Sequence, residues 1–232
     1  MLNSTHTFFV ANSGGGKTNL VVALLTNPRL FGGNVFDAVY VVSPSVKVDS
    51  TWAHLMKYRA KRGQHDDEFF MDTWDGERVQ KLIEESFALT TYHKKNNHQH
   101  ATIVLIVVDD MADASHILHA TGNSILNSLF IRGRHAYLSV WICSRRPNLV
   151  SSIIRTQMSA LFIFKQRNVK DLITFLDEFS AMVDKNTFMD LYKTATENKY
   201  NFLYINLLAT AVDHMLYWDI DKIFTVSDMD QM

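Results

Sequence analysis

The sequence predicts an α/β fold in which a mostly parallel central sheet is flanked by helices. Three observations lead to this prediction. A glycine-rich loop at residues 11–18 stands between an apolar run and a helix-like stretch. A second apolar run, at residues 102–110, ends in two carboxylates, as expected of a buried strand whose carboxyl end faces a ligand. Strand-like and helix-like stretches alternate along the rest of the chain, which is the pattern of βα units.

The composition is that of a folded protein of the cell interior. The 232 residues are 47% hydrophobic and 20% charged, enough for one sizeable core. The net charge of −1 does not indicate a polyanion partner, so a nucleic-acid contact would require local basic patches. The single cysteine, Cys143, excludes an internal disulfide framework and suits a reducing compartment. We expect no signal peptide and no membrane-spanning segment. We also expect one domain at residues 1–226, followed by a polar tail at 227–232.

The glycine-rich loop has the context of a phosphate-binding P-loop. A strand is expected at residues 6–11 and a helix at 17–26. The three glycines allow the backbone N–H groups to point inward at phosphate oxygens, and the helix N-terminus adds its positive dipole end. Lys17 would reach the β- and γ-phosphates of ATP, and the Thr18 hydroxyl would hold Mg²⁺. The alternative is a glycine-rich turn followed by a chance Lys-Thr pair. The candidate nucleotide-binding residues are Asn12, Ser13, Gly14, Gly15, Gly16, Lys17, Thr18 and Asn19.

The next stretch continues the alternation of strands and helices. Residues 36–42 are rich in β-branched side chains and stop at a Ser-Pro pair, which predicts a second strand. Residues 52–61 are expected to be helical, and residues 69–74 to form a short edge strand. An apolar stripe at helical spacing predicts a long helix at residues 77–95.

The run at residues 102–110 supplies the second half of the expected site. Its six consecutive apolar residues describe a strand buried on both faces. Asp109 is then the Walker B aspartate, which contacts Mg²⁺ directly or through water. Asp110 is placed to accept a proton from the attacking water or to orient it, with Asp113 as the substitute. The alternative is a strand that ends in a solvated acidic turn.

A further βα unit follows. Residues 123–132 carry an apolar face and predict a helix that ends at Gly133. The strand expected at residues 138–143 delivers residues 144–147 to the same sheet edge, where a polar side chain would act as a γ-phosphate sensor. Cys143 is expected to be a small core residue.

The last part of the chain is expected to complete the sheet. Residues 160–164 predict a fifth strand and residues 172–179 part of a helix. Residues 202–208 and 215–218 are expected to form late strands, antiparallel at the sheet edge.

A basic cluster near residue 60 is a candidate DNA contact. It holds four cations in six residues with a tyrosine among them, and such a cluster can bind the phosphates of DNA threaded through a ring. The alternative is the solvated end of a helix. The histidine-rich stretch at residues 93–100 is a weaker candidate for a DNA contact and does not form a convincing metal site. The four candidates for DNA binding are Lys57, Arg59, Lys61 and Arg62.

Several motifs, taken in order, resemble one group of motor proteins. Residues 16–18, 109–113 and 133–147 are similar to those of the FtsK–HerA branch of P-loop ATPases, and in particular to the DNA-packaging ATPases of poxviruses, nucleocytoplasmic large DNA viruses and virophages. Arg134-His135 followed by Leu-Ser-Val resembles their Arg-His-x-x-x-Ser signature. The similarity runs over residues 8–218.

This resemblance implies a RecA-like ASCE core with extra strands at the sheet edge. It also implies an ATPase that uses ATP and Mg²⁺ to translocate double-stranded DNA into a preformed capsid. The implied partners are DNA, capsid or portal-vertex proteins, and copies of the chain in a homo-oligomeric ring, a pentamer or hexamer. The implied location is the viral assembly site in the host cytoplasm, or the virion.

The resemblance also extends the candidate catalytic residues. Arg145 stands where the family usually has a sensor glutamine, and Asp110 where the FtsK translocases usually carry glutamate. An arginine supplied by a neighbouring subunit can stabilise the transferred phosphoryl group. Arg134 and Arg155 are the preferred candidates over Arg146, each with the alternative of an ion pair in its own chain. The candidate catalytic residues are therefore Asp110, Lys17, Arg134, Arg155 and Arg145.

Two other function classes stay open. The first is a nucleotide switch or assembly factor that binds ATP without moving DNA. The second is a small-molecule kinase, which shares the P-loop, but the sequence lacks an obvious substrate lid.

Overall fold

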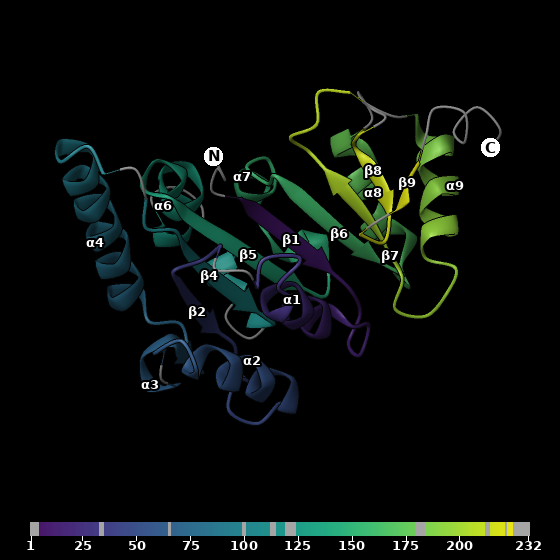
Figure 1. Ribbon diagram of the computed structural model, residues 1–232. Helices are drawn as coiled ribbons and strands as arrows, with labels where there is room; N and C mark the ends of the chain where they lie inside the picture. Colours follow the sequence, from purple (N-terminus) through teal and green to yellow (C-terminus); the bar gives the residue numbers. More distant parts are fainter. Residues whose placement is uncertain are drawn as a thin grey trace.

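The computed structural model describes residues 5–32, 35–64, 66–98, 101–111, 115–118, 124–179, 184–211, 214–220 and 222–224. Within these residues nine strands form one sheet, with helices on both of its faces (Figure 1). The strands up to β6 run parallel, and β7, β8 and β9 are antiparallel additions at one edge. The expected mostly parallel sheet with late antiparallel edge strands is confirmed. Across the sheet the order is β3 (Phe70–Met71), β2 (Ala38–Val42), β4 (Val104–Asp109), β5 (Leu138–Ser144), β1 (His6–Val10), β6 (Ala160–Phe164), β7 (Phe202–Asn206), β8 (Leu216–Trp218) and β9 (Lys222–Ile223).

The sheet is covered on both faces because its central strands alternate large apolar side chains between two clusters. Phe8 packs into one cluster, and its neighbour Phe9 packs into the other. Helices α1 (Lys17–Thr26) and α2 (Ser50–Ala60) cover the Phe9 face. The Phe8 face is covered by α4 (Gly76–Lys95), α6 (Ile125–Arg132), α7 (Ser152–Arg155), α8 (Val169–Phe179) and α9 (Lys185–Ala195).

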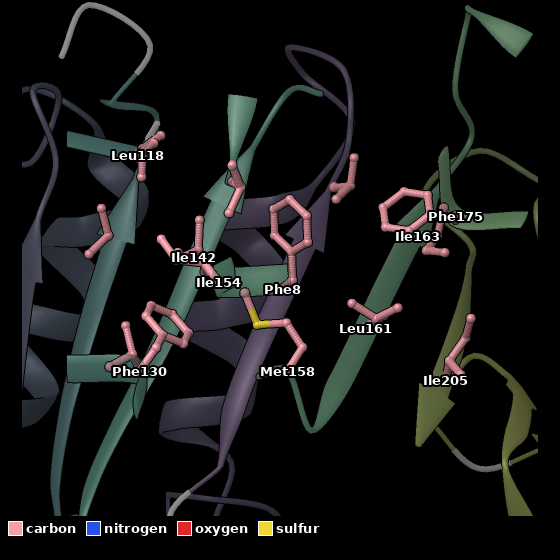
Figure 2. Close-up of a cluster of buried hydrophobic side chains, with 14 of the residues drawn as sticks. Phe8, Leu118, Phe130, Ile142, Ile154, Met158, Leu161, Ile163, Phe175 and Ile205 are labelled. Carbon is pink, nitrogen blue, oxygen red and sulfur yellow. The ribbon is translucent and has the colours of Figure 1, made fainter. Parts of the chain in front are cut away.

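Figure 2 shows the core on the Phe8 face. Phe8 from β1 and Ile142 from β5 point toward the same layer as Met158 and Phe130. The Phe8 and Phe175 rings lie with their centroids 6.2 Å apart, which joins β1 to α8. Because β1, β4 and β5 are buried along their whole length, the loops at their ends rest on a rigid support.

Most expected elements are present, and the differences lie in the less regular segments. The edge strand expected at residues 69–74 has only two residues, those of β3, and the short helix α3 (Asp66–Phe69) includes the first residue of the expected strand. Helix α9 and strand β9 were not predicted, although Phe188, Leu191, Tyr192 and Ala195 of α9 have helical spacing and are buried. The remaining short elements are α5 (Ser115–Leu118) and the 3₁₀ turns η2 (Gly133–Ala136) and η3 (Pro147–Leu149).

Two expectations fall outside the described residues: the polar tail and Asp113. No helix within the described ranges is long and apolar enough to cross a membrane.

Candidate nucleotide site

The candidate site lies at the carboxyl edge of the three central parallel strands. Strand β5 lies between β1 and β4, so the glycine-rich loop after β1 and the carboxylates after β4 stand on either side of the end of β5. Two backbone hydrogen bonds join the three strand ends. The Ala11 N–H donates to the Ser144 carbonyl at 3.2 Å, and the Asp110 N–H donates to the Cys143 carbonyl at 3.2 Å. The expected convergence of these loops at one edge is therefore present.

The glycine-rich loop has a backbone that other residues would strain. Gly14 has φ 70° and Gly16 has φ 102°, both in the left-handed region. A Cβ atom on Gly15 would lie 2.9 Å from both the Ala11 Cβ and the Asn12 carbonyl oxygen. Gly16 is also the N-cap of α1, so the loop leads directly into the positive end of that helix. The loop and the helix N-terminus together form an anion-binding concavity of the kind that holds phosphates.

A buried cation and a buried carboxylate face this edge. Lys17 is 7% exposed and its Nζ donates to the Ala11 carbonyl at 3.3 Å. Asp109 is 3% exposed and accepts a hydrogen bond from the Ser43 Oγ at 3.2 Å. Burial raises the pKa of Asp109 to about 6, and the positive charge of Lys17 opposes this shift. The charge of Lys17 thus partly compensates the buried Asp109 carboxylate, and carboxylates with such perturbed pKa values cluster at functional sites.

Ser43 is a residue that the sequence reasoning missed. It follows β2, the neighbour of β4, and is fully buried. The signal was its position directly after an expected strand, since the ends of adjacent parallel strands meet at one edge.

Asp110 and Arg145 form an ion pair across the ends of β4 and β5. The Arg145 Nη2 lies 2.5 Å from the Asp110 Oδ2, and the two side chains are 48% and 30% exposed. Asp110 has φ 50°, so its backbone turns through the left-handed region, which aspartate tolerates better than most residues.

The Thr18 and Asp109 oxygens suit Mg²⁺, a hard cation that binds one or two protein oxygens and keeps phosphate and water ligands. Thr18 is half-buried in the first turn of α1. The described residues contain no group of three or more His, Cys, Asp or Glu side chains that would hold a metal without help from a substrate.

A cavity of about 410 Å³ adjoins the glycine-rich loop. Its far walls come from residues 164–167, at and just after the end of β6, and from the segment before β7, which includes Tyr200. Tyr200 has φ 73° and a ring that is largely exposed, with the Lys199 Nζ 4.6 Å from the ring centroid. The Asn12 Nδ2 donates to the Lys165 carbonyl at 2.9 Å and so ties the loop to this wall. The sequence reasoning did not assign Tyr200 a role.

Comparisons with known proteins bear on this geometry. No protein-family model matches the sequence. The chain is 24% identical over 161 residues to the uncharacterized protein 075L of invertebrate iridescent virus 6. The matched region covers 68% of this chain and 59% of that protein. The chain thus matches about three fifths of the length of this relative.

Solved structures resemble the chain over most of its length. The genome packaging NTPase B204 from Sulfolobus turreted icosahedral virus 2, in complex with ATPγS, has a TM-score of 0.55 at 14% identity, covering 91% of this chain and 96% of that one. The chain has the fold of the P-loop NTPases. The pCW3 conjugation coupling protein TcpA, also with ATPγS, has a TM-score of 0.56 at 16% identity, covering 99% of this chain and 65% of that one. The expected similarity to viral packaging ATPases is confirmed at the level of the fold.

Within this P-loop fold the candidate arginines occupy different places. Arg134 lies in η2, which precedes β5, so it stands at the sheet edge opposite the P-loop. There it lines a second cavity of about 290 Å³ together with His6. Arg155 is 13% exposed and is held by its own chain, with its Nε 2.6 Å from the Glu178 carboxylate and its Nη1 donating to the Val150 carbonyl. Arg155 therefore follows the alternative of an intrachain ion pair, whereas Arg134 and Arg146 are exposed.

The basic cluster is divided between the surface and the interior. Lys57, Lys61 and Arg62 are exposed. Arg59 is 3% exposed; its Nε donates to the Gln64 Oε1 at 2.7 Å, and its Nη2 donates to two backbone carbonyls at 3.2 Å. Arg59 thus stabilises the loop after α2, and the expected DNA contact does not extend to it.

Proposed function

We propose that the protein hydrolyses ATP at the carboxyl edge of β1, β5 and β4 and uses the energy to drive double-stranded DNA into a preformed capsid. The observation that carries the ATPase part is the pair of buried charged groups, Lys17 and Asp109, on either side of the end of β5. The packaging part is supported by the structural similarity to a protein named as a genome packaging NTPase.

The phosphates of ATP would lie in the P-loop. Backbone N–H groups around Gly14 and Gly16 and the N-terminus of α1 would donate to phosphate oxygens. Lys17 would leave the Ala11 carbonyl, a weak partner at 3.3 Å, for a charge-assisted contact to the β- and γ-phosphates. Thr18 and Asp109 would hold Mg²⁺, which when bound neutralises charge on the phosphate oxygens.

The nucleoside would occupy the cavity beside the P-loop. The cavity opens directly from Asn12 and Gly15, so a chain of phosphates in the P-loop would lead the ribose and base into it. Its exposed aromatic ring, Tyr200, offers a flat apolar surface for a base.

Asp110 is the group that would act on the attacking water. It directly follows Asp109, the proposed Mg²⁺ ligand, and its side chain pairs with Arg145 at the end of β5, the strand next to β1. A carboxylate in that place can accept the water proton or orient the oxygen toward the γ-phosphate.

Assembly would complete the motor. A homo-oligomeric ring, a pentamer or hexamer, would bring Arg134 of one subunit toward the P-loop of the next. Lys57, Lys61 and Arg62 form an exposed basic surface for DNA phosphates. Capsid or portal-vertex proteins are the further partners, and the viral assembly site in the host cytoplasm, or the virion, is the proposed location.

The test is the steady-state rate of phosphate release from ATP with and without double-stranded DNA. A motor predicts a rate that rises sharply with DNA and a stimulation that weakens as salt increases, because the DNA contacts are electrostatic. Tight ATP binding with negligible turnover, with or without DNA, would instead indicate a nucleotide switch or assembly factor.

A further inference from the structure

The ion pair between Arg145 and Asp110 joins two groups that both have a place in hydrolysis. Asp110 is the candidate base, and the Arg145 Nη2 lies 2.5 Å from its Oδ2. A carboxylate that is paired with a guanidinium in this way has one oxygen already engaged, so that oxygen is not open to the attacking water.

Arg145 also stands next to the P-loop. It directly follows Ser144, whose carbonyl accepts the hydrogen bond from the Ala11 N–H at the start of the loop. Strand β5 separates the P-loop strand from the Asp110 strand, so a side chain at its end can turn to either side. A guanidinium fork binds phosphate with the same bidentate geometry as carboxylate.

We propose that Arg145 exchanges partners during the ATP cycle, an inference that rests on the proposed function. Without nucleotide, Arg145 holds Asp110. When a triphosphate is bound, the guanidinium moves to the γ-phosphate and releases the Asp110 carboxylate for the attacking water. The γ-phosphate thus frees the carboxylate that acts on it, and Arg145 contacts the γ-phosphate itself.

The strength of the pair allows such an exchange. Both side chains are partly exposed, and ion pairs of this kind change an equilibrium by no more than about fivefold. A γ-phosphate next to a P-loop carries more negative charge than one carboxylate, so it competes well for the guanidinium. The Asp110 N–H stays bonded to the Cys143 carbonyl in this arrangement, so the exchange requires side-chain rotation rather than movement of the strand end.

The experiment compares the dissociation constants of Mg·ATPγS and Mg·ADP for four proteins: wild type, Asp110→Asn, Arg145→Gln and the double variant. Asp110→Asn removes the competitor for Arg145. It should therefore tighten ATPγS binding in the wild-type background by roughly two- to fivefold more than in the Arg145→Gln background. ADP lacks the γ-phosphate, so its affinities should show no such dependence on Arg145. Arg145→Lys should retain part of the coupling.

Three outcomes would overturn the proposal. An equal effect of Asp110→Asn on ATPγS affinity in both backgrounds would mean that Asp110 acts through its charge alone and not through Arg145. The same coupling with ADP as with ATPγS would show that the γ-phosphate is not the second partner. If the wild type binds neither nucleotide, the proposed function itself is wrong and the exchange fails with it; binding without coupling rejects the exchange alone.

Discussion

Asp109→Asn should make the nucleotide-free protein more stable while removing its ability to hold Mg²⁺. The Asp109 carboxylate is almost fully buried, with Ser43 as its hydrogen-bond donor and Lys17 as its nearby cation. Burial disfavours the charged form, which is why the pKa of Asp109 rises from 3.8 to about 6. Asparagine has nearly the same shape, carries no charge and keeps an oxygen that can accept from Ser43.

The size and pH dependence of this gain follow from the shift of the Asp109 pKa. A carboxyl whose pKa is raised on folding stabilises the folded state below its ordinary pKa, and this stabilisation is lost as the pH rises through the folded-state pKa. For a pKa shift from 3.8 to about 6, the free energy of unfolding of the wild type falls by at most about 3 kcal/mol at pH 7.5 and about 1 kcal/mol at pH 4.5. Asn does not titrate, so the variant should exceed the wild type by these amounts.

The assay is urea unfolding of both proteins at pH 7.5 and pH 4.5, without nucleotide. Asp110→Asn is the matched control, because that carboxylate is partly exposed and its loss should change the free energy of unfolding by less than about 1 kcal/mol. Destabilisation by the charged Asp109 carboxylate is ruled out if Asp109→Asn is no more stable than the wild type at pH 7.5, or if its gain in stability is as large at pH 4.5. Adding Mg·ATP should stabilise the wild type more than the variant.

Three further predictions concern turnover, the base cavity and the ring. Asp110→Asn should still bind Mg·ATP while phosphate release falls by roughly two to four orders of magnitude; full activity would assign the base elsewhere. Tyr200→Ala should weaken ATP binding about tenfold through loss of the aromatic surface and leave tripolyphosphate binding unchanged. The control is Tyr92→Ala, which removes an exposed tyrosine on α4 and should change the binding of neither ligand. Equal weakening of ATP and tripolyphosphate binding by Tyr200→Ala would contradict the cavity assignment. A Lys17→Ala protein, which is inactive but keeps Arg134, should restore phosphate release when mixed with Arg134→Ala subunits. The reason is that an arginine supplied in trans raises the rate of hydrolysis on the order of 10³-fold or more. Mixed rings that show no recovery of phosphate release would exclude Arg134 as this arginine.

The sequence predicted those parts of the fold and site that depend on local pattern. The helix at residues 17–26 and the strand at 160–164 agree with the structure at both ends, because a glycine loop and a β-rich run mark them locally. The meeting of Lys17 with Asp109 was also predictable, since ligand-binding groups gather at the carboxyl ends of parallel strands.

The remaining site features depend on contacts between distant segments, which the sequence does not display. Arg59 looked like one of four surface cations, but it is buried through contacts with Phe36, Asp37 and Gln64. Arg155 pairs with Glu178, 23 residues away in another helix. Tyr200 lines the cavity only because the segment before the antiparallel strand β7 returns to the P-loop.

Hydrolysis of ATP at the P-loop can be tested with the Lys17→Ala variant. Phosphate release from ATP should be measured with and without double-stranded DNA for the wild type and this variant. Lys17 supplies the charge-assisted contact to the phosphates, so we expect the variant to lose hydrolysis and to bind ATP more weakly. Hydrolysis by Lys17→Ala at the wild-type rate would contradict it.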